Sequence, residues 1–170
     1  MKNFTLAFLA LIAITFTATQ TIFAQETRNG LTWYTDVQQA YAVSSKTQKP
    51  IFGFFTGSDW CGWCKRLQAA VFAKPEFQAW AKKNVVLLEL DFPRMKQLPE
   101  KQAQQNAELQ NVFQVGGYPT VWLFNLDKDK KTQKFNISAL GSLGYPRSEP
   151  GQEAATFLAS ANDILKNKKK

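Results

Sequence analysis

The stretch Trp60-Cys61-Gly62-Trp63-Cys64-Lys65 follows the apolar run Ile51-Phe52-Gly53-Phe54-Phe55 and holds both cysteines of this 170-residue chain. Two thiols separated by two residues can close a disulfide across one helical turn. If that turn begins a helix, the first thiol lies at the positive end of the backbone dipole, where it ionises more readily than a free cysteine with its pKa of about 8.5. The thiolate is the form that attacks disulfides. We therefore interpret Cys61 and Cys64 as a redox-active pair.

A cysteine pair at this spacing has three other common roles. A structural disulfide is usual in exported proteins, but a ring of about four residues contributes only roughly 2 kcal/mol to stability. Structural zinc requires four Cys or His ligands, and the chain contains two cysteines and no histidine. A covalent c-type haem requires His after the second cysteine, where this chain has Lys65. We expect no metal and no bound cofactor, and a structural disulfide stays as the alternative to redox chemistry.

The N-terminus has the pattern of an export signal. Lys2 supplies positive charge before a short apolar stretch, residues 4–16, and a more polar segment that ends at Ala24. An apolar core of roughly 7–15 residues is typical of signal peptides, whereas a membrane span needs roughly 20. We predict a signal peptide over residues 1–24 and a periplasmic or secreted protein. Ile22 is larger than the peptidase prefers, so an uncleaved membrane anchor is the alternative.

Removal of that segment leaves enough chain for a single domain with its own core. We place this domain at residues 31–165, after a linker over 25–30 and before a lysine-rich tail over 166–170. The whole chain has 21 Lys and Arg against 13 Asp and Glu. Loss of Lys2 gives a net charge of +7, and four of these charges lie in the tail. The remaining body is too weakly basic to indicate nucleic-acid binding. We expect a monomer.

The hydrophobic periodicity predicts an α/β fold with a mixed central sheet and helices on both faces. Thr35 and Gln38 fit a capping box at the start of the first helix, which Lys49-Pro50 ends. Apolar runs predict strands near Trp33 and at 51–55, 85–90, 121–126 and 134–140. Helical spacing predicts helices between 35 and 48, at 61–72, from Pro75, at 99–114 with Leu109, Val112 and Phe113 packed inward, and at 154–165. The predicted order is β-α-β-α-β-α-β-β-α.

This order of elements resembles the thioredoxin superfamily over roughly Leu31 to Leu165, with the stretch 60–65 after a strand and Gly117-Tyr118-Pro119-Thr120 before the next hairpin. The resemblance implies a thioredoxin fold, a cis peptide bond before Pro119, and a loop that lies against the cysteine pair and pairs with the substrate backbone. The chain is similar in particular to exported bacterial thioredoxin-like proteins and to the periplasmic C-terminal domain of the membrane electron carrier that reduces other periplasmic thioredoxins.

Two features of the thioredoxin pattern are missing. Thioredoxins carry a buried Asp six residues before the first cysteine, where this chain has Phe55. They also carry a buried Lys on the next strand, where Val85 to Leu88 is wholly apolar. These groups help the second cysteine to lose its proton, so Cys64 would depend on water, Asp59 or Lys65.

We therefore predict a thiol–disulfide oxidoreductase. Cys61, at the open N-terminal end of its helix, attacks a substrate disulfide, and Cys64, on the buried face, resolves the mixed disulfide. Five neighbouring residues are expected to contact the substrate: Trp60, Gly62, Trp63, Tyr118 and Pro119. The tryptophans would form a partly exposed apolar platform for clients.

The expected partners are disulfide-containing protein clients. Strong oxidants of the superfamily carry His between their cysteines, where this chain has Trp63. We therefore expect a reductant or isomerase that receives electrons from a membrane thiol reductase. The alternative is a redox-inert thioredoxin-fold protein that binds clients, or acts as a chaperone, through its aromatic surface. For the long segment from Asp91 to Pro119, packing is favoured over a partner-specific surface.

Overall fold

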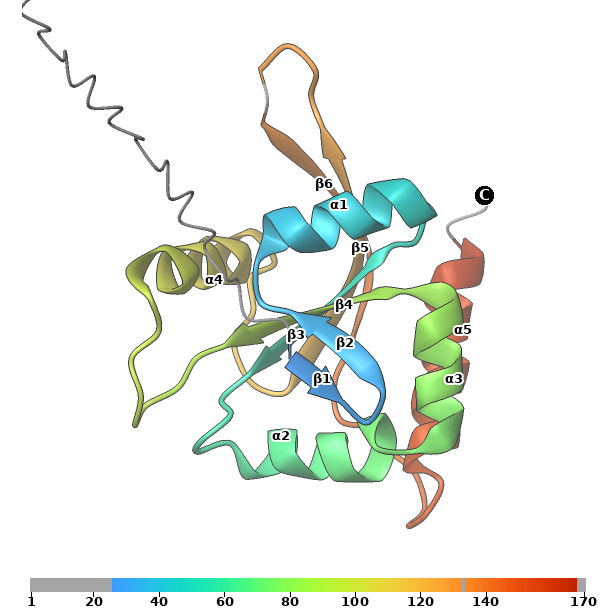
Figure 1. The fold of residues 1–170 in the computed structure, drawn as a ribbon. Helices are drawn as coiled ribbons and strands as arrows, with labels where there is room; N and C mark the ends of the chain where they lie inside the picture. The colour runs from blue at the N-terminus through green and yellow to red at the C-terminus, as the bar shows by residue number, and fades with distance from the viewer. Residues whose placement is uncertain (1–25, 133, 168–170) are drawn as a thin grey trace, which may run out of the picture.

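The computed structural model describes residues 26–132 and 134–167 (Figure 1). The predicted signal peptide lies outside these ranges, as do the last three lysines of the predicted tail. Within the described ranges, none of the helices combines the length and the hydropathy that a membrane crossing requires.

A six-stranded sheet forms the centre of the molecule. Its strands are β1 (Glu26–Arg28), β2 (Leu31–Tyr34), β3 (Ile51–Thr56), β4 (Val86–Asp91), β5 (Thr120–Lys128) and β6 (Phe135–Leu143). Their order across the sheet is β1-β2-β4-β3-β5-β6. β2, β4 and β3 run parallel to one another, whereas β1, β5 and β6 are joined by antiparallel pairing. The predicted mixed sheet is therefore confirmed.

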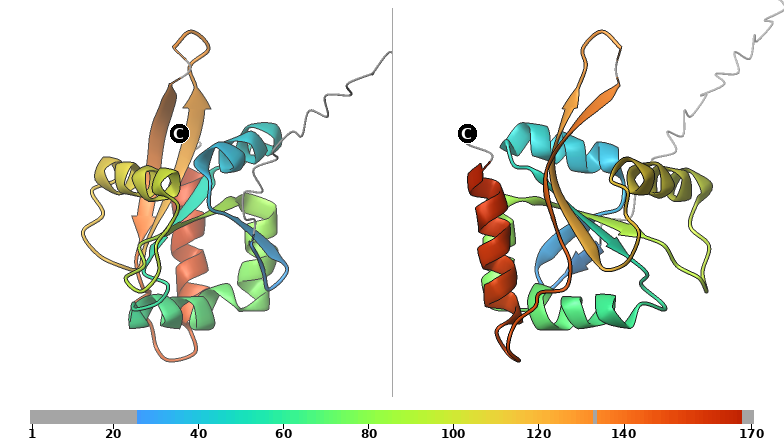
Figure 2. Two further views of the ribbon diagram at one scale, coloured as in Figure 1. Left: turned by 60° about the vertical axis from the view of Figure 1, so that its left-hand side comes forward. Right: turned by 180° about the vertical axis from the view of Figure 1, so that it is seen from behind.

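Helices cover both faces of this sheet, which Figure 2 shows from two further sides. They are α1 (Val37–Thr47), α2 (Gly62–Leu67), α3 (Pro75–Asn84), α4 (Glu100–Val112) and α5 (Glu153–Asn167), and a π-helical turn (Gln68–Phe72) continues α2. Side chains of α2, the π-helical turn, α3 and α5 pack on one face of the sheet. Those of α1 and α4 pack on the other face. The two helical layers are the predicted ones.

The central strand β3 separates two apolar cores. Phe52 and Phe54 belong to the core under α2, α3 and α5, whereas Ile51 and Phe55 belong to the core under α1 and α4. This follows from the alternation of side chains along a strand. All four side chains are fully buried, which explains why β3 is apolar along its whole length. Both cysteines lie in the core of Phe52 and Phe54.

The segment predicted as a linker contains strand β1 and its turn. Asn29 and Gly30 both have positive φ, 52° and 68°, and they join β1 to β2 in a tight antiparallel hairpin. An Asn-Gly pair is the preferred sequence for such a turn because both residues tolerate this conformation. The linker prediction is wrong for residues 26–28, which pair with β2 in the sheet. β1 was missed because a strand of three residues is too short to show a periodic pattern.

Two details of the helices also differ from the predictions. The cap of α1 is Asp36, whose Oδ1 accepts the backbone N–H of Gln38 (2.8 Å) and Gln39 (2.9 Å), and not a Thr35–Gln38 capping box. An Asp at this position satisfies two amides that the first turn leaves free. At the end of α4, Val112 is 58% exposed, and Leu109 and Phe113 supply the apolar packing. The predicted inward position of Val112 is therefore wrong.

Candidate active site

Cys61 is the N-cap of α2, so the helix begins where the cysteine motif predicts. Strand β3 ends at Thr56, and a turn follows in which Gly57 O accepts the N–H groups of Trp60 (3.3 Å) and Cys61 (2.8 Å). Cys61 and Cys64 are joined in a disulfide. The N–H of Cys64 donates to Cys61 Sγ at 3.1 Å. The first sulfur therefore occupies the position of a capping oxygen, at the positive end of the helix.

The two cysteine residues differ little in burial. Cys64 is fully buried, as predicted, but Cys61 is only 5% exposed, although the sequence predicts an open position. Its contact with the amide of Cys64 explains the difference, because a capping side chain is directed back into the first turn of its helix. The exposed surface beside the disulfide belongs to Gly62 and to the two tryptophans.

Trp60 is fixed to the loop that follows β4. Its Nε1 donates to Phe92 O at 2.8 Å, and its ring lies edge-on to Tyr118 with 5.8 Å between the ring centroids. A Cβ added at Gly57 would lie 2.5 Å from the same Nε1. A side chain at position 57 would therefore displace this indole. In spite of these contacts, Trp60 is 36% exposed to solvent.

Trp63 lies between the cysteines and is 53% exposed. Its ring lies edge-on to Tyr145 at 5.0 Å, and Arg66 Cζ is 4.9 Å from its ring centroid. The predicted exposed aromatic platform therefore exists, and it includes a tyrosine that the sequence interpretation did not single out. Tyr145 was missed because it lies on the loop after β6, 82 residues away from Trp63 in the chain.

The loop before β5 lies beside this platform. The Tyr118–Pro119 peptide bond is cis, as the resemblance implied, and Pro119 is buried. The ring of Tyr118 is stacked on Phe92 at 5.2 Å, and its hydroxyl accepts Gln110 Nε2 at 2.8 Å. Burial raises the pKa of the Tyr118 hydroxyl above its usual range. Tyr118 thus connects the cysteine turn to α4.

Asp59 and Lys65, predicted to assist Cys64, contact surface groups instead. The Asp59 carboxylate accepts the backbone N–H groups of Met95 (2.8 Å) and Arg94 (3.1 Å). These hydrogen bonds, that of Met95 foremost, lower the pKa of Asp59. Lys65 Nζ donates to the backbone oxygen of Asp59 at 3.2 Å. Asp59 therefore fastens the cysteine turn to the loop after β4, and Lys65 closes a contact within the turn itself.

A second carboxylate, at the end of β4, holds the same turn. Asp91, buried at the end of β4, accepts the backbone N–H (2.8 Å) and the hydroxyl (2.7 Å) of Ser58. It also pairs with Lys96 at 3.1 Å. Asn106 on α4 donates to the backbone oxygen of Asp91 at 2.9 Å. The long segment after Asp91 therefore packs against the site and supports its shape. Packing is the role that the sequence analysis favoured for this segment.

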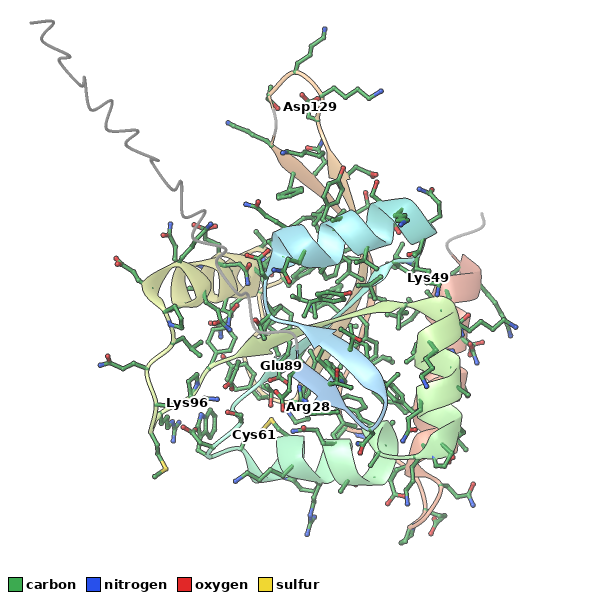
Figure 3. All side chains as sticks on the ribbon, in the orientation of Figure 1. Arg28, Lys49, Cys61, Glu89, Lys96 and Asp129 are labelled. Carbon is green, nitrogen blue, oxygen red and sulfur yellow. A yellow bond between two sulfur atoms is a disulfide. The ribbon has the colours of Figure 1, made fainter. Side chains whose placement is uncertain are left out.

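A partly buried ion pair lies between the sheet and the helical segment that begins with α2 (Figure 3). Glu89 on β4 is 8% exposed and pairs with Arg28 on β1. Arg28 Nη1 also donates to Gln68 Oε1 at 3.0 Å, and Gln68 Nε2 reaches Cys64 O at 3.5 Å. Burial raises the pKa of Glu89, and this effect outweighs the opposing charge of Arg28. These contacts connect an ionisable group to the second cysteine.

The sequence interpretation missed this pair. Glu89 interrupts a strand that is otherwise apolar up to its last residue, Asp91, and that contrast was a usable signal. Arg28 gave no such signal, because it becomes a neighbour of Glu89 only through the β1–β2 hairpin. Across the described ranges, no three His, Cys, Asp or Glu side chains gather in a way that would hold a metal ion.

Comparison with known proteins gives consistent matches. Residues 32–125 match the sequence profile of the thioredoxin-like family. Disulfide bond reductase DsbH of Chlamydia pneumoniae is 35% identical over 128 residues, which are 75% of this chain and 69% of that protein. Thioredoxin-related protein DsbJ of the same organism is 28% identical over 148 residues, 86% of this chain, which spans only 41% of DsbJ.

Solved structures show the same likeness. A structure of DsbH oxidoreductase superposes with a TM-score of 0.65 at 30% identity, and the match covers 91% of this chain and 94% of the other. A thioredoxin from Thermus thermophilus superposes with a TM-score of 0.54 at 17% identity, covering 79% and 87%. At this lower identity the second likeness is one of fold alone.

Proposed function

Because this chain belongs to the thioredoxin-like family and is a thiol–disulfide oxidoreductase, we propose that it is an exported enzyme that reduces or isomerises disulfides of protein clients. The predicted thioredoxin fold is confirmed by the same matches. The observation that carries the proposal is the position of Cys61 at the N-cap of α2, where its sulfur accepts the amide of Cys64. A thiolate formed at this sulfur gains the same hydrogen bond and the positive end of the helix dipole.

The reaction moves two electrons from the enzyme to the client. The Cys61 thiolate attacks one sulfur of the client disulfide, so that the client S–S bond breaks and a mixed disulfide forms. The Cys64 thiolate then attacks Cys61 Sγ, which closes the Cys61–Cys64 disulfide and releases the second client sulfur. The client leaves with two thiols and takes up two protons. The oxidised enzyme needs a dithiol donor, and we assign this role to a membrane thiol reductase.

The client segment is proposed to lie on the surface around the disulfide. Five residues are proposed to bind the client there: Trp60, Gly62, Trp63, Tyr118 and Pro119, of which the buried Pro119 would act by shaping its loop. Gly62 and Trp63 separate the sulfurs and are exposed, and Trp60 and Tyr118 contact each other beside them. Exposed aromatic rings offer apolar area to an unfolded segment. The relative named as a disulfide bond reductase supports reduction as the direction.

Export is proposed from the N-terminal pattern, with a signal peptide over residues 1–24 ahead of the domain that starts with β1. The mature protein would then act in the periplasm or after secretion. Amino-terminal sequencing of the protein recovered from that compartment checks this, and Gln25 is the expected first residue. An intact N-terminus there would support the membrane anchor instead.

Cysteine substitutions test the catalytic assignment. With a chemical dithiol supplied, the wild-type protein should reduce a glutathione-blocked peptide, and Cys61→Ser should show no turnover. Cys64→Ser should accumulate mixed disulfides with clients, because the first step proceeds and the resolving thiol is missing. Non-reducing electrophoresis and mass spectrometry identify the trapped clients.

The matched control for these variants is Ala69→Ser, which adds a hydroxyl at an exposed position near the cysteines and leaves both thiols. It should retain turnover. Alkylation of the reduced protein near neutral pH should label Cys61 before Cys64. Preferential labelling of Cys64, or turnover by Cys61→Ser, would contradict the assignment of roles.

A further inference from the structure

Each exposed tryptophan beside the disulfide carries an arginine on its ring. Arg94 Cζ lies 3.8 Å from the ring centroid of Trp60, and Arg66 Cζ lies 4.9 Å from that of Trp63. The arginines come from different segments: Arg66 is in α2, and Arg94 is in the loop after β4. The tryptophans immediately precede Cys61 and Cys64 in the chain. We call these four residues, Trp60, Arg94, Trp63 and Arg66, the arginine–tryptophan rim.

The guanidinium groups of the rim form no salt bridge within the described part of the chain. Within the described residues, neither Arg66 nor Arg94 has an ion-pair partner within 4.0 Å. A guanidinium stacked on an indole keeps the N–H groups at its edge directed to solvent, in a planar fork that matches a carboxylate. Stacking also restricts the side chain before a ligand arrives, so less conformational freedom is lost on binding.

Carboxylates of the protein itself offset only part of the positive charge of this region. Asp59 lies close to Arg94 in the fold, but its oxygens accept backbone amides of residues 94 and 95. Asp91 is buried and is bound by Ser58 and Lys96. Lys96 is offset by its pairing with Asp91, whereas Lys65 is exposed in α2 and adds positive charge beside Arg66. The surface around the disulfide is therefore basic as well as aromatic.

We propose that the arginine–tryptophan rim binds acidic side chains next to the client's disulfide, so that the enzyme selects clients whose cysteines are flanked by Asp or Glu. The ligand is an extended polypeptide: its sulfur reaches Cys61, its apolar groups contact the indoles, and its carboxylates pair with Arg66 and Arg94. Charge complementarity around an apolar centre gives selectivity and faster association. This proposal rests on the proposed oxidoreductase function and adds its client class.

Three matched disulfide peptides test the proposal. Each has one cysteine blocked by glutathione and differs only at the two flanking positions, which are Glu, Gln or Lys. The rate constant for reduction of each peptide is measured with pre-reduced enzyme by rapid mixing. For the wild type at low salt, we expect the Glu peptide to react about three- to tenfold faster than the Gln peptide, because exposed charge pairs are individually weak. The Lys peptide should be slower than the Gln peptide.

Salt and substitutions identify the source of this preference. The Glu/Gln ratio should fall toward one as the ionic strength rises to about 0.5 M, because charges at the surface are screened. It should fall in the same way at low salt in the double variant Arg66→Gln, Arg94→Gln. The control Lys46→Gln removes an exposed charge from α1, on the opposite face of the sheet, and should keep the wild-type ratio.

A wild-type Glu/Gln ratio near one, or a ratio that the double variant retains, would overturn the proposal while the enzyme still reduces the Gln peptide. A failure to reduce any of the three peptides would instead remove the oxidoreductase function on which the proposal rests. The two failures are therefore distinguishable in one experiment.

Discussion

At the scale of single residues, the carboxyl of Glu89 is unusual because it is buried and shares Arg28 with Gln68 of the π-helical turn. Burial raises the pKa of Glu89 above its ordinary 4.5 in the folded protein, in spite of the nearby guanidinium. The folded state therefore binds this proton more tightly than the unfolded chain does. The free energy of unfolding should then decrease as the pH rises from the ordinary pKa through the raised one.

The variant Glu89→Gln tests this linkage, because an amide cannot titrate. Urea unfolding of the oxidised protein at a series of pH values from about 4.5 upward should show a steeper loss of stability in the wild type than in the variant. Glu149→Gln, at an exposed loop position, is the matched control and should keep the wild-type slope. Equal slopes for the wild type and Glu89→Gln would mean that the ion pair with Arg28 compensates fully for burial.

Gln68, which contacts Arg28, also contacts the backbone oxygen of Cys64. This contact places Glu89 and Arg28 near the redox centre. The sequence suggested that Asp59 or Lys65 would assist Cys64. Asp59 instead holds the loop after β4, and Lys65 donates to the backbone oxygen of Asp59. Such assignments fail from sequence because the partner of a short polar side chain is set by the local turn. The turn itself was not predictable in detail.

At the scale of elements, α2 has the main influence on the reduction potential of the cysteine pair. Its N-terminus stabilises a thiolate at Cys61. The position between the cysteines that carries His in strong oxidants is Trp63 here, and an indole adds no charge. The cations nearby, Lys65 and Arg66, are exposed, so solvent screens their effect on the sulfur. We therefore expect a reduction potential nearer to that of thioredoxin, about −270 mV, than to that of a strong oxidant, about −120 mV.

Equilibration of the protein with glutathione redox buffers measures this potential, with the fraction of oxidised protein followed by tryptophan fluorescence or by alkylation. A value above roughly −160 mV would place the protein among the dedicated oxidants and would contradict the proposed direction. The variant Trp63→His is the informative comparison. A cationic imidazole beside the thiolate favours the reduced form, so its potential should be higher than that of the wild type.

At the scale of the whole molecule, the arrangement of layers could be predicted because it depends on patterns that extend over many residues. The apolar run of β3 and the helical spacing of Phe157 and Ala161 on α5 are strong signals of burial, and both are confirmed. Cys61 at a helix start followed from one motif and the strand before it. The cysteine site was therefore largely visible in the sequence.

The features that could not be predicted join distant segments or very short ones. Arg28 and Glu89 are 61 residues apart and meet only because β1 pairs with β2 and β2 with β4. The Asn29-Gly30 turn was a usable signal for that hairpin and was overlooked. The burial of Cys61 followed from a single hydrogen bond to its sulfur. Contacts of this kind are decided by side-chain geometry and leave no periodic trace.

The fastening of the cysteine turn by Asp59 and Asp91 has a consequence for repeated use of the enzyme. Those contacts run through oxygen and nitrogen atoms, to Ser58, Lys96 and the amides of residues 94 and 95, and none of them passes through sulfur. Opening the Cys61–Cys64 bond therefore leaves the scaffold of the turn in place. We expect the turn around Cys61 to keep its shape in both oxidation states, so that each catalytic cycle changes the bonding of two sulfur atoms and little else.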